Sequence, residues 1–209
     1  MLISMESRLG RHALFWLLLP VLLVLAAPAV PQLGLYRVSQ AEIEGNRRLL
    51  GEAAEAQAEA RAAKLWSHWF VDSGLVRWTF NTFARRYEGP NTVSSWRDLA
   101  RGYLQRLWWT VYKACYRFEV ALAWFAAAGI VLAAAFADGA MRRLIKSCEF
   151  GYANPVAFSM TAYGLMSVGG LLLAIPFAPV AIQQWVWPCV IGAAAGLAWK
   201  AAESYQCAL

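Results

Sequence analysis

Four long apolar stretches constrain the fold of this chain more than any other feature of its sequence. A transmembrane helix needs about 20 mostly apolar residues, and each stretch reaches or approaches that length. Charged residues make up only 15% of the 209 residues, whereas about 25% is typical of soluble domains. We therefore predict an all-α membrane protein with four transmembrane helices, at residues 14–30, 118–137, 155–177 and 181–199.

The first stretch has two interpretations. Residues 1–30 combine a basic N-terminal end with an apolar run and the small-residue motif Ala27-Pro28-Ala29, which is also the layout of a cleaved signal peptide. We expect a retained membrane anchor. The last two stretches are separated by only a few residues, so residues 155–199 are expected to form an antiparallel transmembrane hairpin.

Residues 31–117, between the first and second spans, are expected to be largely helical and to lie outside the membrane. Ser39 and Glu42 have the spacing of a capping box, in which the two side chains satisfy backbone N–H groups at a helix start. No proline follows before Phe70, so one long helix is predicted from Ser39 onward. Turns are expected at Gly74 and at residues 87–91.

A second helix is predicted to begin near Ser95 and to continue without a break through the second span. Its apolar side chains recur every three or four residues, which assigns its basic residues, among them Arg101, Lys113 and Arg117, to the remaining surface. Four aromatic residues, Trp108, Trp109, Tyr112 and Tyr116, are expected near the outer membrane interface. The predicted apolar face consists of Trp96, Leu99, Tyr103, Leu107, Val111, Cys115 and Phe118.

The charges of the short loops predict the orientation of the chain. The loop at residues 138–154 carries Arg142, Arg143 and Lys146, and the N-terminal end carries Arg8 and Arg11. Short loops rich in Lys and Arg remain in the cytoplasm. We therefore predict a multi-pass protein of the bacterial inner membrane, with residues 31–117 in the periplasm and both termini, including the tail at 200–209, in the cytoplasm.

The sequence contains none of the common catalytic motifs, such as a Walker A loop, G-x-S-x-G or H-E-x-x-H. Ionisable residues near membrane spans are functional candidates. Here Glu119, Asp138, Glu149 and Lys200 all fall at span ends, which favours ion pairing over proton relay. The four cysteines and two histidines are too scattered for a metal or redox site. We expect no enzyme activity, no cofactor, no metal and no sequence-specific DNA binding.

Small residues indicate where helices can approach each other closely. Gly192 and Gly196 form a G-x-x-x-G motif in the fourth stretch, and such motifs favour close helix packing in membranes. Ala123, Ala127 and Gly129 supply small residues in the second stretch. The packing partner could be a helix of the same chain, another protein or a second copy, and the sequence leaves these alternatives open.

Two runs of residues carry a resemblance to a known family. They are YEGPNTVSSWRDLARGYLQRLWWTVYKACYRFEV, from Tyr87 to Val120, and DGAMRRLIKSCEFGYANPV, from Asp138 to Val156. On these runs the chain resembles membrane proteins encoded within integrative conjugative elements, a family with about four spans and a domain of unknown function. Asp138 and Gly139, with Arg142 and Arg143, match the most recognisable motif of that family.

The resemblance implies a role in conjugation and no catalytic residue. Members of the family resemble the small membrane protein that accompanies the coupling ATPase, the motor that hands DNA to a type IV secretion channel. We therefore expect a non-enzymatic component that binds this ATPase or channel subunits. Its basic loop, from Asp138 and Gly139 to Lys146, would contact an acidic protein patch or anionic membrane lipids. The alternative is a self-associating small transporter or pore.

Overall fold

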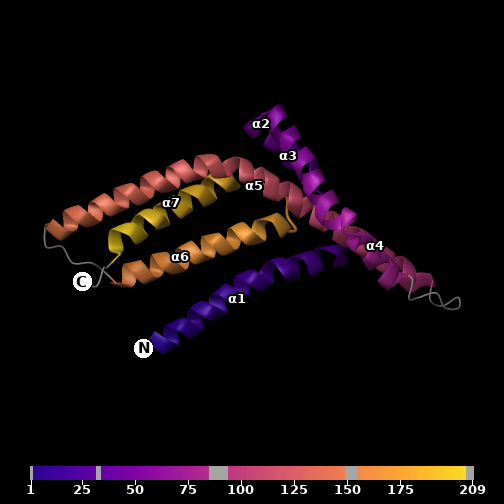
Figure 1. Cartoon of the computed structure of the whole chain (residues 1–209), viewed down its shortest axis with the longest axis horizontal. Helices are drawn as coiled ribbons and strands as arrows, with labels where there is room; N and C mark the ends of the chain where they lie inside the picture. The colour runs from indigo at the N-terminus through magenta and orange to yellow at the C-terminus, as the bar shows by residue number, and fades with distance from the viewer. Residues whose placement is uncertain (1, 32–33, 85–93, 149–154, 206–209) are drawn as a thin grey trace. The chain divides into compact units, whose positions relative to one another are not determined.

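The computed structural model describes residues 2–31, 34–84, 94–148 and 155–205, and every regular element within them is helical (Figure 1). The expected turn at 87–91, the part of the basic loop at 149–154 with Glu149, and the tail after 205 lie outside the described residues. In chain order the helices are α1 (Leu2–Ala26), η1 (Ala27–Ala29), α2 (Gln40–Leu50), α3 (Glu52–Trp66), η3 (Ser67–Asp72), α4 (Leu75–Thr79), η4 (Phe80–Ala84), α5 (Ser94–Cys148), α6 (Pro155–Ala174), η6 (Ile175–Phe177) and α7 (Val186–Ser204).

Two helical stretches among the described residues are long and apolar enough to cross a membrane, Gly10–Ala29 and Val156–Phe177. A third qualifies if the parts of α5 on either side of residue 126 are counted as one span. These stretches match the first, third and second predicted spans. The fourth predicted stretch does not qualify by itself, since α7 extends to Ser204 and includes Lys200 and Glu203.

The chain divides into two compact units. The first contains residues 1–18, 124–173 and 184–209, and therefore the start of α1, the second half of α5, and most of α6 and α7. In Figure 1 these segments run alongside one another. Glycines mark the closest approaches, because a side chain at each would overlap a neighbour: Gly170 meets Trp16 of α1, Gly164 meets Leu197 of α7, and Gly139 meets Trp199 of α7.

The second unit contains residues 19–123 and 174–183. It includes the two helices that the sequence predicted as one, because Gly51 separates α2 from α3. Gly51 has a φ of 87°, a conformation that residues with a side chain rarely adopt, and its N–H donates to the Arg47 carbonyl to close α2. A second glycine in this conformation, Gly74 with a φ of 77°, turns the chain between η3 and α4. The absence of proline was therefore insufficient to predict one continuous helix.

The helix α5 begins next to the predicted start and runs on to Cys148. The prediction that a loop starts at Asp138 was wrong for residues 138–148, which continue the helix. No proline stands in that stretch, and Asp138 and Arg142 form an ion pair across one helical turn, 3.8 Å from Oδ2 to Nε, which suits continued helix.

The predicted apolar face of α5 is only partly correct: Cys115 is buried, and Tyr103, Leu107 and Val111 are half-buried. Leu99 and Phe118 are exposed, whereas Lys113 and Arg117 are buried. Hydrophobic periodicity fails here because polar partners from other segments compensate the buried charges.

Candidate functional site

A buried ion pair lies at the centre of the second unit. Arg117 of α5 and Glu42 of α2 have side chains that are each only 2% exposed. The guanidinium binds the carboxylate in a bidentate manner, with Nε 2.8 Å from Oε1 and Nη2 2.7 Å from Oε2. Two parallel charge-assisted bonds of this kind fix both orientation and distance. The pair therefore holds the start of α2 against α5.

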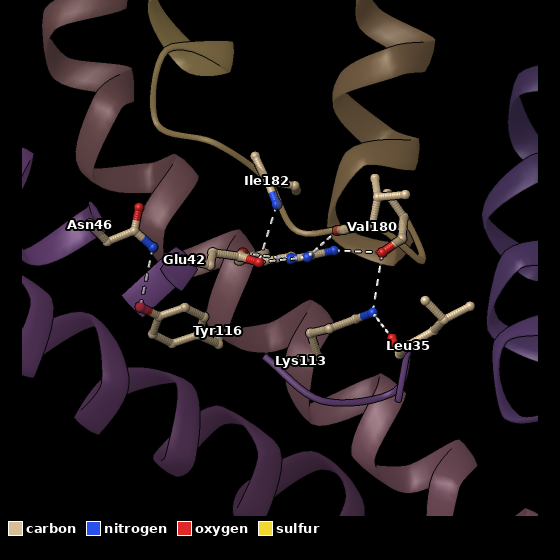
Figure 2. A network of polar contacts seen from close by, with 9 residues as sticks. Leu35, Glu42, Asn46, Lys113, Tyr116, Val180 and Ile182 are labelled. Carbon is tan, nitrogen blue, oxygen red and sulfur yellow. Dashed lines mark hydrogen bonds and ion pairs between the residues drawn. The ribbon is translucent and has the colours of Figure 1, made fainter. Parts of the chain in front are cut away.

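The same guanidinium also binds the segment that connects α6 to α7. Its Nη1 donates to the carbonyl of Ala178 and its Nη2 to that of Val180, each at 2.6 Å. The Glu42 carboxylate in turn accepts the backbone N–H of Ile182 at 3.2 Å (Figure 2). α7 begins at Val186, five residues after the predicted start of the fourth span.

Lys113 lies one helical turn before Arg117 and binds a further connecting segment. Its ammonium donates to the carbonyl of Leu35, which precedes α2, and to the carbonyl of Ala178 at 3.1 Å (Figure 2). Lys113 and Arg117 thus both bind the connection between α6 and α7, and Lys113 also binds the segment between α1 and α2. Buried cations require such partners, since an unpaired buried charge is strongly unfavourable.

A second layer of polar contacts joins α3 to the same face of α5. The hydroxyl of Tyr116 accepts a bond from Asn46 and donates to Glu55, both at 3.2 Å. Glu55 also pairs with Arg47 at 3.2 Å. The buried side chains of Glu42, Lys113, Tyr116 and Arg117 therefore all have hydrogen-bonding partners. We call the set of Glu42, Lys113, Tyr116 and Arg117 with their partners the polar clamp.

Ser39 and Glu119, two residues that the sequence singled out, lie next to and on helices that the clamp joins, respectively. Ser39 precedes α2 as predicted, but its side chain makes no capping hydrogen bond. The Glu42 carboxylate, which would complete a capping box, binds Arg117 instead. Glu119 pairs with Arg61 of α3, with 3.4 Å between Nε and Oε2. An ion pair at this span end is what the sequence predicts for Glu119, and the partner comes from a neighbouring helix.

A cavity of about 350 Å³ lies beside the clamp. Its lining combines aromatic rings of α5 with carboxylates of α3 and one cation, and consists of Arg37, Val38, Ile43, Glu55, Glu59, Trp109, Tyr112 and Tyr116. The aromatic cluster that was expected at the outer membrane interface therefore packs in part against α3. Trp66 of α3 meets the ring of Tyr112 edge-on, with 6.0 Å between centroids.

The predicted interaction residues in the first unit gather where α5 meets the end of α7. Trp199 donates its indole N–H to Asp138 at 2.6 Å, and the guanidinium of Arg142 lies 5.1 Å from the centre of the Trp199 ring. Arg143 is placed 5.7 Å from the ring of Tyr205. Gly139 is required at its position because a Cβ there would overlap the Trp199 carbonyl.

One turn further on, Lys146 pairs with Glu203, which also binds Lys200 at 2.6 Å. The hydrogen bond from Lys146, followed by that from Lys200, lowers the pKa of the Glu203 carboxyl below its ordinary value. Sequence analysis missed Trp199 and Glu203 as partners of the basic residues, because their distance along the chain gives no sign of the contact. Four cations, Arg142, Arg143, Lys146 and Lys200, thus lie around two carboxylates, Asp138 and Glu203. We call this mainly basic surface, with Trp199, the basic end.

The small residues predicted to pack closely are mostly open in the first unit. A Cβ added at Gly129, Gly192 or Gly196 would meet no other described atom within 4 Å. Ala127 is exposed as well, and Ala123 is half-buried. Within the described residues, the close helix approaches are instead made at Gly139, Gly164 and Gly170. The G-x-x-x-G face of α7 is therefore open along the described chain.

Histidine and acidic side chains were considered as metal ligands. Among the described residues, no group of three or more His, Cys, Asp or Glu side chains could hold a metal ion. His12 of α1 instead bonds Ser167 of α6 at 3.1 Å and accepts the indole N–H of Trp16 at 3.2 Å.

Comparison with known proteins places this geometry in a functional context. The family model for IncC plasmid conjugative DNA transfer proteins of the DtrJ-like type matches residues 36–206, which is more than four fifths of the chain. The match covers the basic end, α7 and the polar clamp except Leu35. No curated protein and no solved structure matches the chain.

Proposed function

The chain belongs to the DtrJ-like family of conjugative DNA transfer proteins, and we propose that it is a non-enzymatic inner-membrane component that binds the type IV coupling ATPase or subunits of the secretion channel. The family match over residues 36–206 carries this proposal. The match indicates the process, conjugative DNA transfer. The open G-x-x-x-G face of α7 and the basic end supply surfaces for a partner. The sequence resemblance to proteins of integrative conjugative elements supports the same process.

We propose four membrane crossings, and the contacts within each unit support that number. Suppose first that α6 crosses once, so that its two ends lie on opposite sides. Arg117 binds Ala178, so the start of the second span and the end of α6 lie on one side. The chain must then cross between Arg117 and the start of α6, which requires a crossing in α5.

A further crossing then falls to α7. Lys146 follows the crossing in α5 and pairs with Glu203, so these two residues lie on the side opposite to Ala178. The chain must therefore cross again between Ala178 and Glu203, and α7 is the helix in that interval. The fourth predicted span, residues 181–199, lies within this interval and ends before Lys200.

The charge distribution supports a cytoplasmic location for the basic end. Arg142, Arg143, Lys146 and Lys200 lie together at the ends of α5 and α7, and basic residues close to spans favour the cytoplasmic side. Both termini would then be cytoplasmic and α2–α4 periplasmic. A reporter that is active only in the periplasm should be active when fused after Ser39 and inactive after Cys207. The opposite pattern would refute this orientation.

Partner binding is tested by purification of the full-length protein in mild detergent from cells that carry the conjugative element. We expect a coupling ATPase or channel subunit to be recovered in stoichiometric amounts. Arg142→Gln with Arg143→Gln should reduce recovery if the basic end contacts an acidic patch. Arg101→Gln is the matched control, since Arg101 is exposed on the same helix at the other end. Recovery of homomers alone, with ion conductance in vesicles, would favour the pore alternative.

A further inference from the structure

Residues 67–84, in the helices η3, α4 and η4, expose large apolar side chains in a part of the chain that is too short to span a membrane. Trp69 is 63% exposed, Trp78 59% and Phe83 50%. Leu75 and Val71 are exposed in the same segment. Several large apolar side chains exposed within one short segment favour an interaction surface over ordinary solvent-facing surface. We call these five residues the aromatic patch.

The patch is anchored to α5 near one defined residue, Trp108. The indole N–H of Trp108 donates to Thr79 of α4 at 3.1 Å, and its ring lies 5.6 Å from that of Phe70 in η3. The two rings of the patch at Trp78 and Phe83 meet edge-on at 6.4 Å. The patch therefore belongs to a folded part of the second unit.

Two further bonds place α5 beside the end of the first candidate span at the same level. Tyr103 donates to the carbonyl of Leu25 at 2.8 Å, and Arg106 to that of Pro28 at 2.9 Å. Arg106 precedes Trp108 by only two residues, about 3 Å along a helix. The aromatic patch is thus fixed to α5 at the level where the span Gly10–Ala29 ends.

The outer surface of that span supplies continuity with lipid. Val21, Leu22 and Leu25 are each more than half exposed, as expected for side chains that face lipid in a span with 11% of its residues buried. An apolar surface at the same level as the end of this span reaches the boundary between lipid tails and headgroups. Trp and Phe side chains favour that boundary. Arg77 of the segment and Lys64, near the end of α3, are exposed cations that suit anionic headgroups.

We propose that residues 67–84 form an interfacial membrane anchor, with the aromatic patch inserted in the outer leaflet of the same bilayer that α1 crosses. This inference rests on the proposed membrane crossing of α1 and adds a lipid contact to the segment that the sequence assigned wholly outside the membrane. The occupant is the lipid surface, because the patch continues the lipid-facing surface of α1 and carries interfacial residue types.

The test measures depth at single spin labels in the full-length protein in vesicles of phosphatidylethanolamine and phosphatidylglycerol. The native cysteines are replaced by serine, and labels are attached in the variants Trp69→Cys, Trp78→Cys and Phe83→Cys. Leu22→Cys is the lipid-facing control. Gln57→Cys, on the exposed surface of α3, is the water-facing control. The ratio of accessibility to oxygen over that to a water-soluble nickel complex increases with depth in the bilayer.

We expect the three patch labels to give ratios above that of Gln57→Cys and up to that of Leu22→Cys. Ratios equal to the water control, with Leu22→Cys in lipid, would overturn the anchor and leave the crossing of α1 intact. Low accessibility to both reagents, with spin–spin broadening, would show a contact between copies and also overturn it. If Leu22→Cys reads as water, the crossing itself is refuted.

Quenching by brominated lipids provides a measurement that needs no cysteine replacement. The variant with Trp69→Phe and Trp78→Phe should lose part of the lipid-quenchable tryptophan fluorescence of the unaltered protein. An unchanged quenched fraction would contradict insertion of these two side chains, whatever the behaviour of the labelled variants.

Discussion

Replacement of Glu42 by alanine tests the polar clamp most directly. It leaves the Arg117 guanidinium buried, 2% exposed, with its carbonyl contacts but without its counter-charge. Removal of one partner from a buried ion pair costs about 3–5 kcal/mol, since an uncompensated charge remains. The N–H of Ile182 also loses its acceptor in this variant. We therefore expect the segment from Ala178 to Ile182 to open far more often.

Hydrogen exchange of the full-length protein in detergent measures that opening locally. A loss of 3–5 kcal/mol corresponds to an increase of roughly 10²–10⁴-fold in exchange at Ile182, since 1.4 kcal/mol is tenfold. Glu44→Ala is the matched control, because Glu44 is exposed on the same helix, two residues from Glu42. Exchange that is equally slow in both variants would refute the clamp as the element that holds this connection.

A double replacement separates the charge from the packing. Glu42→Leu together with Arg117→Met removes both charges and keeps similar volumes, and such exchanges are often neutral or stabilising. We expect the double variant to be more stable than Glu42→Ala by most of the lost free energy. Double-variant stability below that of Glu42→Ala would mean that the carbonyl contacts of Arg117 matter more than its ion pair.

Three further predictions concern the first unit. Gly139→Leu should destabilise the contact between α5 and α7 by about 1–3 kcal/mol through overpacking, measured by unfolding in mixed micelles, whereas Gly129→Leu, in open space, should have little effect. Glu203 lies beyond the expected end of the fourth span, and its carboxyl has a lowered pKa. Its contribution to stability is therefore present at neutral pH and is lost as the pH falls through that pKa. Glu203→Gln should abolish this acid-dependent loss in a pH series of melting curves. Gly192→Leu with Gly196→Leu should leave the purified chain folded but reduce conjugation frequency, and unchanged transfer would show that the G-x-x-x-G face has no partner.

The helical class and the candidate spans could be predicted from the sequence because long apolar runs report directly on lipid. The stretches at 14–30 and 155–177 correspond closely to the candidate spans Gly10–Ala29 and Val156–Phe177. A role in conjugation followed from the resemblance of two sequence runs to proteins of integrative conjugative elements. The family match at residues 36–206 confirms conjugative DNA transfer as the process.

The polar clamp could not be predicted because its members follow the rules of other structures. Glu42 has the position of a capping residue, and Lys113 and Arg117 are the residue types expected on an exposed helix surface. Only contacts across more than 60 positions of the chain bring these groups together. A partial signal existed, since Lys113 and Arg117 are one turn apart and immediately precede a span, where ionisable residues are functional candidates.

The choice of arginine at position 117 follows from the number of acceptors it must satisfy. The guanidinium binds both oxygens of Glu42 and two carbonyls, Ala178 and Val180, from opposite edges of its planar fork. A lysine ammonium is a compact charge without that geometry, and Lys113 indeed binds only carbonyl oxygens. Arg117 therefore binds the connection between α6 and α7 at two carbonyls while it holds the start of α2 through Glu42. Two cations next to the second predicted span thus hold the connection between α6 and α7 against α5.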